Sequence, residues 1–361
     1  MKFYFLKKKI SPNHPQLLFN GVPVAKVNNQ NHLGLILDSK LSFCNHLSEK
    51  IAKAKKNIGI IRHLSRYLPL KTLNQMYKFL VRSHLDYCDI IYHEPAVINL
   101  PPIGLSLTML MENVERIQYQ AALAVTGTWK GSSRNKLYEE LGWESLSDRR
   151  KCRRVLQLHK IINEETPPYL SNKLPRPRRV QHNATIATFP NIFCRTNRYR
   201  NSFNPDAISS WNTCMSHFID SPSSRLLKKH IFSLFRPSPK IMFEIHDPLG
   251  IQYLFQLRVG LSPLKSHKKH HNFADTLSDK CSCTLGIENI SHFLFQCPLY
   301  TTQRASLAAS VILVLLRNNL NHLGNQERLY LYGHDSLNMN DNKAILLSTI
   351  KYIKDTKRFN A

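Results

Sequence analysis

The sequence predicts an α+β protein that is mainly α-helical, with a small antiparallel β piece at its start and a small Cys/His module in its C-terminal helical region. Short apolar runs fill residues 3–37, and an Asn-Gly pair at residues 20–21 between two of them is typical of a tight hairpin. After residue 38, apolar residues recur every three or four positions, which is the period of a helix face. Three of the eight cysteines lie within residues 281–297, which marks the module.

The elements follow in order from these patterns. Strands are expected at residues 3–5, 17–19, 22–24 and 33–37. The first helix is expected over about residues 42–67, because its apolar residues fall on one face. Pro69 opens the next helix, since its missing N–H costs nothing in a first turn. Further helices are expected at residues 109–125, 148–162, 206–214, 222–235, 301–320 and 341–357.

The length and the local composition of the chain divide it into parts. A chain of 361 residues, 42% of them hydrophobic, can bury a core in two or three domains. Residues 171–240 stand out because they carry twelve Lys or Arg against two acidic residues, among frequent prolines. We therefore expect a β piece at residues 1–40, a helical domain at 41–166, a basic proline-containing connector with short helices at 167–244 and a Cys/His domain at 245–361.

The charge favours a polyanionic partner. Lys and Arg number 50 against 24 Asp and Glu, a formal charge of +26, and a polyanionic partner would relieve this self-repulsion. Nucleic acid is the first candidate and an acidic membrane surface the second. The N-terminus lacks the features of a signal peptide, and the longest apolar run, residues 308–316, is too short to span a bilayer. Five scattered cysteines are expected to be reduced thiols of an intracellular protein, in the cytoplasm or the nucleus. They are Cys44, Cys88, Cys152, Cys194 and Cys214.

The clustered cysteines have the spacing of a metal site, C-x-C-x8-H-x4-C. The four residues are Cys281, Cys283, His292 and Cys297. Two thiolates followed by a histidine and a thiolate about one helical turn apart can surround zinc tetrahedrally. Because the protein would fill all four positions, the zinc would be structural and not catalytic. The alternative is a set of reduced core thiols beside a hydrogen-bonded histidine.

Two basic segments are candidates for contact with nucleic acid. Residues 46–82 carry nine Lys or Arg and one acidic residue, so one side of this helix could follow a phosphate backbone. The charges off its apolar stripe are Lys50, Lys53, Lys55, Lys56 and Arg62. Residues 193–203 interleave aromatic and Arg residues, which suits RNA or single strands. The residues are Arg195, Arg198, Tyr199 and Arg200. The alternatives are a solvated helix face and a basic loop whose aromatics pack.

Catalytic motifs are missing from the sequence. It contains no Asp-Asp pair, no phosphate-binding glycine-rich loop, no GxSxG and no HExxH. Asp86 and Asp89 are three positions apart and could share a helix face, but no third carboxylate is in view. Hydrogen bonding at a helix end or an ion pair with a neighbouring cation is their expected use. The residues therefore favour a binding protein over an enzyme.

Several stretches resemble one family of proteins. Residues 32–43, HLGLILDSKLSF, resemble the HLGxxLDxxLxF stretch that follows the catalytic palm in reverse transcriptases of non-LTR retrotransposons, particularly jockey-like elements. Residues 82–92, 118–127, 141–150, 195–203 and the cysteine cluster are similar to the same proteins in the same order. Together these stretches cover nearly the whole chain.

The resemblance implies a nucleic-acid-binding fragment of an RNA-directed DNA polymerase. Residues 1–40 would be a palm remnant, residues 12–37 a primer-gripping hairpin with His32, Leu33 and Gly34 in it, and residues 41–166 a helical thumb-like domain. The Cys/His module would contact template RNA or target DNA. The F/Y-x-D-D motif would lie before this segment, so the resemblance carries over no catalytic residue.

Two alternatives stay open beside this implication. The chain could be an incomplete gene model of an active polymerase, whose fingers, palm and Mg²⁺ sites lie upstream. It could also be a domesticated module that binds nucleic acid or protein. The oligomeric state is left open by the sequence.

Overall fold

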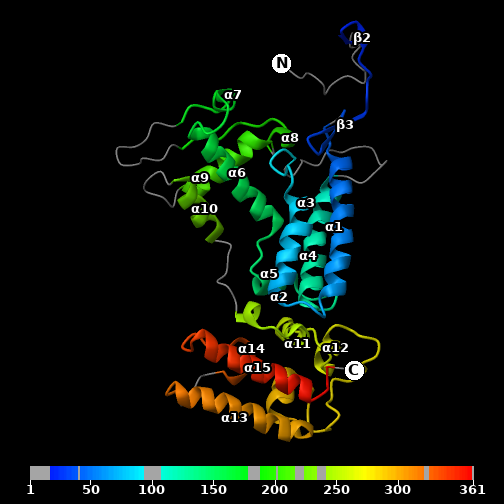
Figure 1. Cartoon of the computed structure of the whole chain (residues 1–361), viewed down its shortest axis with the longest axis vertical. Coiled ribbons are helices and arrows are strands. Elements are labelled where there is room, and N and C mark those ends of the chain that lie inside the picture. Colours follow the sequence, from blue (N-terminus) through cyan, green and yellow to red (C-terminus); the bar gives the residue numbers. More distant parts are fainter. Residues whose placement is uncertain are drawn as a thin grey trace.

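The computed structural model describes residues 17–39, 41–92, 107–177, 188–200, 202–215, 223–233, 241–320 and 325–359. It is mainly helical with two small antiparallel sheets, which confirms the predicted fold class. Figure 1 shows hairpins at one end, helices α1 to α10 in the upper half and helices α11 to α15 in the lower half. The strand predicted at residues 3–5 lies outside the described residues.

The first hairpin confirms the prediction from Asn20 and Gly21. Strand β1 (Leu18–Phe19) pairs antiparallel with β2 (Val22–Pro23) around these two residues. Both have positive φ, 47° for Asn20 and 77° for Gly21, which is the turn geometry that matches the twist of two adjacent strands.

The second hairpin corrects the strand predicted over residues 33–37. Strand β3 (Asn29–His32) pairs with β4 (Leu35–Asp38), and Leu33 and Gly34 form the turn between them. The φ angles of these two residues are 48° and 80°, again the two-residue hairpin geometry, which glycine adopts without cost. The sequence pattern missed the polar strand β3.

Helix α1 (Cys44–Leu64) confirms the helix predicted over residues 42–67, and it packs along α4 (Leu107–Thr126). The carboxylate of Asp38 accepts hydrogen bonds from the peptide N–H groups of Ser42, at 2.9 Å, and Phe43, at 2.8 Å, and so fixes the entry to α1. The predicted apolar stripe is buried. Its buried members are Leu47, Ile51, Ala54, Ile58 and Ile61.

A second helical run follows Pro69, as predicted. It consists of α2 (Leu70–Met76), a π-helical stretch η1 (Tyr77–Arg82) and α3 (Ser83–Asp86). It packs against α1 and α4 and completes the bundle in the upper half of Figure 1.

A separate core forms beside the bundle. Helix α6 (Leu146–Ile162) packs against α9 (Phe203–Met215) and α10 (Ser224–Ser233), and the short helices α7 (Pro168–Ser171) and α8 (Asn197–Arg200) lie in the same part of the chain. Residues from both sides of the boundary predicted at residue 166 share this core. The helices of the basic connector therefore fold onto the last helix of the preceding part.

The C-terminal part contains more helices than the sequence pattern predicted. Helices α13 (Thr301–Arg317) and α15 (Met339–Asp355) match predictions. In this part the pattern missed α11 (Pro248–Val259), α12 (Lys265–His270) and α14 (Gln326–Tyr332), besides the 3₁₀ turn η2 (Ile241–Glu244). Earlier in the chain it missed α5 (Arg134–Leu141) and the short helices α7 and α8. From position 250 onward, every residue of α11 except the half-buried Gln252 is buried, so the helix has no exposed polar face to give a helical period.

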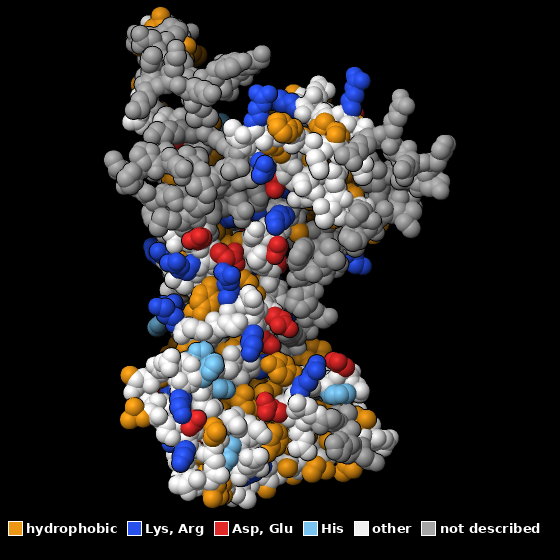
Figure 2. Space-filling model, turned by 180° about the vertical axis from the view of Figure 1, so that it is seen from behind, with side chains coloured by type: hydrophobic (Ala, Val, Ile, Leu, Met, Phe, Trp, Pro, Cys, Tyr) orange, Lys and Arg blue, Asp and Glu red, His pale blue; other side chains and the backbone are white. Residues whose placement is uncertain are grey.

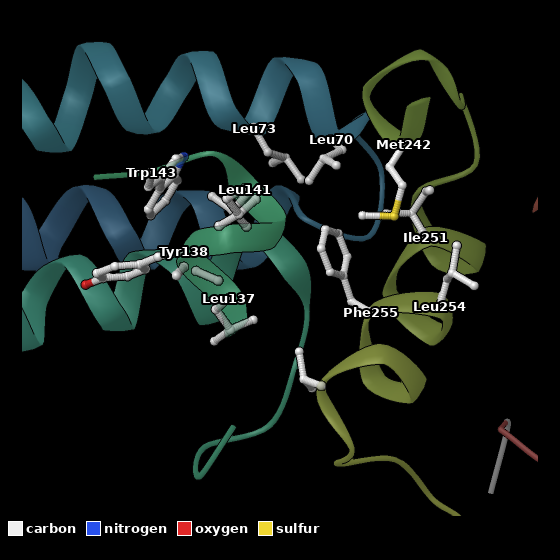
Figure 3. Close-up of a cluster of buried hydrophobic side chains, with 14 of the residues drawn as sticks. Leu70, Leu73, Leu137, Tyr138, Leu141, Trp143, Met242, Ile251, Leu254 and Phe255 are labelled. Carbon is white, nitrogen blue, oxygen red and sulfur yellow. The ribbon is translucent and has the colours of Figure 1, made fainter. Parts of the chain in front are cut away.

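The bundle and the C-terminal helices share one continuous hydrophobic core. Figure 3 shows Leu70 of α2 above Phe255 of α11, with Met242 and Ile251 to the right of both. The side-chain amide of Gln252 donates a hydrogen bond to the carbonyl oxygen of Ser65 at 2.8 Å. The C-terminal part is therefore anchored on the helical bundle.

One helical run among the described residues, Pro298–Arg317, has the length and apolar composition of a membrane span. Only 17% of its apolar window is buried inside the protein. The apolar run of residues 308–316 thus lies within a longer helix that is exposed along most of its length.

Candidate metal centre and basic surfaces

The four residues predicted as metal ligands converge on one point. Their ligand atoms all lie within 4.8 Å of one another. The Sγ atoms of Cys281 and Cys297 are 3.7 Å apart, and the Sγ of Cys283 is 3.2 Å from Nε2 of His292. Cys283 is half-buried and the other three are buried. The cluster could hold a metal ion.

A tight loop brings the first two cysteines together. The N–H of Cys281 donates to the carbonyl of Gly286 at 2.8 Å, and the N–H of Thr284 donates to the carbonyl of Cys281 at 3.0 Å. An isolated bridge between Lys280 and Ile287 closes the loop behind them. Because the chain folds back on itself within these residues, both thiols of the C-x-C pair reach the same point.

A π-helical turn brings the other two residues, His292 and Cys297, to the same side of the chain. Five positions separate His292 from Cys297, which is too many for one α-helical turn. The segment η3 (His292–Gln296) is π-helical, and the N–H of Cys297 donates to the carbonyl of His292 at 2.8 Å. This i to i+5 bond places residues five apart on one face. The side chain of Asn289 accepts from the N–H of His292 at 2.7 Å and fixes the start of the turn.

The thiols have unequal acidities. Burial raises the pKa of Cys297 to about 12. Desolvation also raises the pKa of Cys283, but hydrogen bonds from the Leu285 N–H and the neighbouring thiols outweigh it, so that this pKa lies below its ordinary value. A metal ion would displace the proton from Cys297 on binding, which makes its affinity depend on pH.

A buried ion pair fixes the metal loop to the end of the chain. Glu288, 2% exposed, accepts hydrogen bonds from Nε of Arg358 at 2.7 Å and from Nη2 at 2.9 Å. It also accepts from the N–H of Lys265 at the start of α12, at 2.9 Å. The sequence gives no sign of this arrangement, because Glu288 and Arg358 are 70 positions apart.

The residues predicted to grip a primer lie at the tip of the β3–β4 hairpin. His32 and Leu33 are exposed, Leu33 by 82%. The hydroxyl of Tyr87 donates to the carbonyl of Leu33, and a Cβ on Gly34 would come within 3.0 Å of that hydroxyl oxygen. Gly34 therefore allows the hairpin tip to rest on the segment that follows α3.

The basic residues of α1 do not form one continuous stripe. The ammonium group of Lys50 lies 4.8 Å from the ring centroid of Tyr87, and that of Lys53 lies 2.5 Å from a carboxylate oxygen of Glu49. Lys55, Lys56 and Arg62 are exposed. Figure 2 shows Lys and Arg side chains in separate groups on the visible face, with Asp and Glu between them.

The second basic segment forms the short helix α8. Arg195 precedes it, and Tyr199 and Arg200 lie within it with exposed side chains, Tyr199 by 48%. Arg198 belongs to the same helix, but its side chain lies outside the described part. Nearby Phe193 is 83% exposed, so this aromatic side chain is not packed into the core.

Asp86 and Asp89 form ion pairs, as expected from their isolation from other carboxylates. An oxygen of Asp86 lies 2.7 Å from Nε of Arg149, and an oxygen of Asp89 lies 3.2 Å from Nη1 of Arg153. A further pair joins the buried Arg154 to Asp206 at 2.9 Å. Arg149 and Arg153 come from α6 and tie the second core to the end of α3 and the residues that follow it, whereas Arg154 pairs within the second core, with α9.

Asp89 gives the fold a measurable pH dependence. Its side chain is 1% exposed, and this burial outweighs the attraction of Arg153 and raises its pKa from 3.8 to about 6. The folded state then holds this proton more tightly than the unfolded state, so stability falls as pH rises from about 4 to about 6. Across that range, the unfolding free energy of Asp89→Asn should fall by about 3 kcal/mol less than that of the wild type. Urea unfolding curves of the two proteins at several pH values measure this difference.

The exposed Asp335 offers a matched control, because Asp335→Asn should leave the pH dependence as it is. An unchanged pH dependence in Asp89→Asn would contradict the assignment.

Comparison with known proteins leaves the centre without a family. The chain matches no family model, no curated protein and no solved structure. The likeness of its motifs to non-LTR reverse transcriptases therefore stays a prediction, and the functional conclusion depends on the Cys/His cluster and the charge of the chain.

Proposed function

We propose that this protein binds nucleic acid as the C-terminal, thumb-like part of a non-LTR retrotransposon reverse transcriptase, with a structural zinc ion in its Cys/His cluster. The observation that carries the proposal is the convergence of Cys281, Cys283, His292 and Cys297 in a chain with a net charge of +26. The order of the family-like motifs along the chain supports the same assignment. The proposed setting is intracellular, in the cytoplasm or the nucleus.

The donor set favours zinc. Thiolate and imidazole are the ligands of structural zinc sites, and a tetrahedron with Zn–S bonds of about 2.3 Å has S–S edges of about 3.8 Å. The Cys281–Cys297 separation of 3.7 Å agrees with this edge. Four protein ligands fill the coordination sphere and leave no position for a reacting water molecule, so the ion would stabilise the loop and the start of α13.

The exposed cations on α1 are the best placed to contact phosphates. Lys55, Lys56 and Arg62 project into solvent, whereas Lys50 and Lys53 already interact with Tyr87 and Glu49. On α8, the exposed ring of Tyr199 offers a face for an unpaired base beside Arg200. The proposed ligand is therefore single-stranded RNA or DNA, held mainly by its backbone.

Binding of a fluorescent single-stranded RNA at increasing salt tests the proposal. We expect the affinity to fall steeply with salt, because each neutralised phosphate releases a counterion. The comparison variant carries Lys55→Gln, Lys56→Gln and Arg62→Gln. Between 50 and 200 mM salt, its affinity should fall about 20-fold less than that of the wild type, which is the difference expected for about three phosphate contacts on a single strand.

Lys53→Gln on the same helix is the matched control, because Lys53 is paired with Glu49 and should have little effect. Flat affinity across the salt range would exclude these surfaces. In a primer-extension assay with Mg²⁺ or Mn²⁺ we expect no DNA synthesis, since the sequence contains no Asp-Asp pair. Robust synthesis would contradict the proposed role.

A further inference from the structure

Helix α13 has two opposite apolar faces. Its inner stripe packs against the protein, including α15. The inner residues are Leu307, Val311 and Val314. Its outer stripe faces solvent, with Ile312 exposed by 52% and Leu316 by 61%. The outer stripe consists of Ala305, Ala309, Ile312 and Leu316. A contiguous exposed apolar surface of this kind marks an interaction site.

The outer stripe is uncharged in a strongly basic protein. No charged residue occurs from position 305 to position 316. Of the flanking cations, Arg304 donates to the carbonyl of Cys297, and Arg317 lies 3.7 Å from Asp341 with 74% of its side chain exposed. The stripe therefore offers nothing to a phosphate backbone and fits an apolar, uncharged partner surface.

The spacing of the outer stripe is that of a helix-pairing seam. Its residues are separated by four, three and four positions, the alternation found at the contact positions of a coiled coil. Alanines occupy its first half, and the larger Ile312 and Leu316 occupy its second half. One end is thus narrow and the other is wide.

A second copy of the same helix complements this shape. In an antiparallel pair centred between residues 310 and 311, Ala305 would face Leu316 and Ala309 would face Ile312. The flanking Ala308 would face a leucine, residue 313, in the same register. Each small residue meets a large one under twofold symmetry, which is the arrangement that fills the space between two helices. We propose that the protein self-associates through antiparallel pairing of α13.

The proposed dimer is weak and has a characteristic salt dependence. A single helix pair buries less than the roughly 800 Å² per partner of a standard interface, so the dissociation constant should be micromolar or weaker. Two chains of charge +26 repel each other, and salt screens this repulsion. Self-association should therefore strengthen with salt, opposite to the proposed binding of nucleic acid, so either proposal can fail without the other.

Sedimentation equilibrium of the full chain over a range of concentrations tests the surface. We expect Leu316→Lys to weaken association at least about tenfold, because a charge would be buried in an apolar contact. Leu226→Lys on α10 is the matched control, since Leu226 is also a leucine and is 60% exposed. It should associate like the wild type.

A mixing experiment tests the antiparallel register. Position 309 of one copy meets position 312 of the other, so Ala309→Glu and Ile312→Lys should each weaken self-association. An equimolar mixture of the two variants should form a heterodimer, because one opposite-charge pair forms and one wild-type pair remains. A wild-type chain that stays monomeric overturns the proposal. So does a mixture that associates no better than its components, or a monomer that instead binds lipid vesicles through this stripe.

Discussion

Replacing Cys297 by serine is expected to abolish zinc binding and to unfold the metal loop together with the start of α13. Cys297 is fully buried, its N–H closes the π-turn at His292, and its carbonyl accepts from Arg304. Structural zinc contributes on the order of 10 kcal/mol to the folding of small zinc modules. This is comparable with the whole stability of a domain, so the surrounding core cannot compensate for the loss.

Hydrogen exchange and zinc content of the purified variant measure this outcome together. In Cys297→Ser we expect fast exchange of the amide hydrogens of residues 280–317. The part of α1 that lies away from the shared core should stay protected from exchange. Cys214→Ser is the matched control, because Cys214 is a half-buried free thiol in the second core and should be replaceable without loss of zinc. A Cys297→Ser protein that keeps both its zinc and its protection would contradict the structural role.

The second large effect is expected at Glu140, which neutralises the buried Arg258 between α5 and α11. Their side chains are 2.8 Å apart at Oε2 and Nη1, with 6% of Glu140 and 8% of Arg258 exposed. Arg258 also donates to the carbonyl of Leu331 at 2.8 Å, and its guanidinium lies 4.5 Å from the ring centroid of Tyr332. Glu140→Gln should cost about 3–5 kcal/mol in unfolding free energy, because it leaves a buried charge without its partner.

Urea denaturation of a double-mutant cycle separates this cause from loss of packing. The double variant Glu140→Gln, Arg258→Met should be destabilised by less than the sum of its single variants, because no charge is left unpaired. Glu139→Gln, at an exposed neighbour on α5, should change stability by less than about 0.5 kcal/mol. Additive single effects would show that the two residues are not coupled.

Local chemistry explains which elements the sequence could predict. The first hairpin follows from Asn20 and Gly21, because the turn type depends on these two residues alone. Helix α1 follows from one apolar stripe on an exposed helix. The convergence of the three cysteines and His292 was likewise predictable, since Cys and His at short spacings have few other uses.

The features that the sequence did not predict depend on contacts between distant segments. Helix α11 is buried along most of its circumference and therefore has no clear helical period in its sequence. The pairs Glu288–Arg358 and Glu140–Arg258 join positions 70 and 118 apart. The π-helical turn is one of several backbone conformations that are compatible with the H-x4-C spacing. The sequence indicated the basic surfaces only as an excess of positive charge. It did not show which cations have a local partner, as Lys53 has in Glu49.

Native mass spectrometry of the full chain, purified under reducing conditions without added chelator, measures whether the Cys/His cluster binds zinc. We expect one zinc ion per chain in the wild type and in Cys214→Ser, and none in Cys297→Ser. Zinc-edge X-ray absorption of the wild type should show three sulfur ligands and one nitrogen ligand at about 2.3 and 2.0 Å. A folded wild-type protein that carries no metal would contradict the zinc site, and the three cysteines would then be ordinary reduced thiols beside a buried histidine.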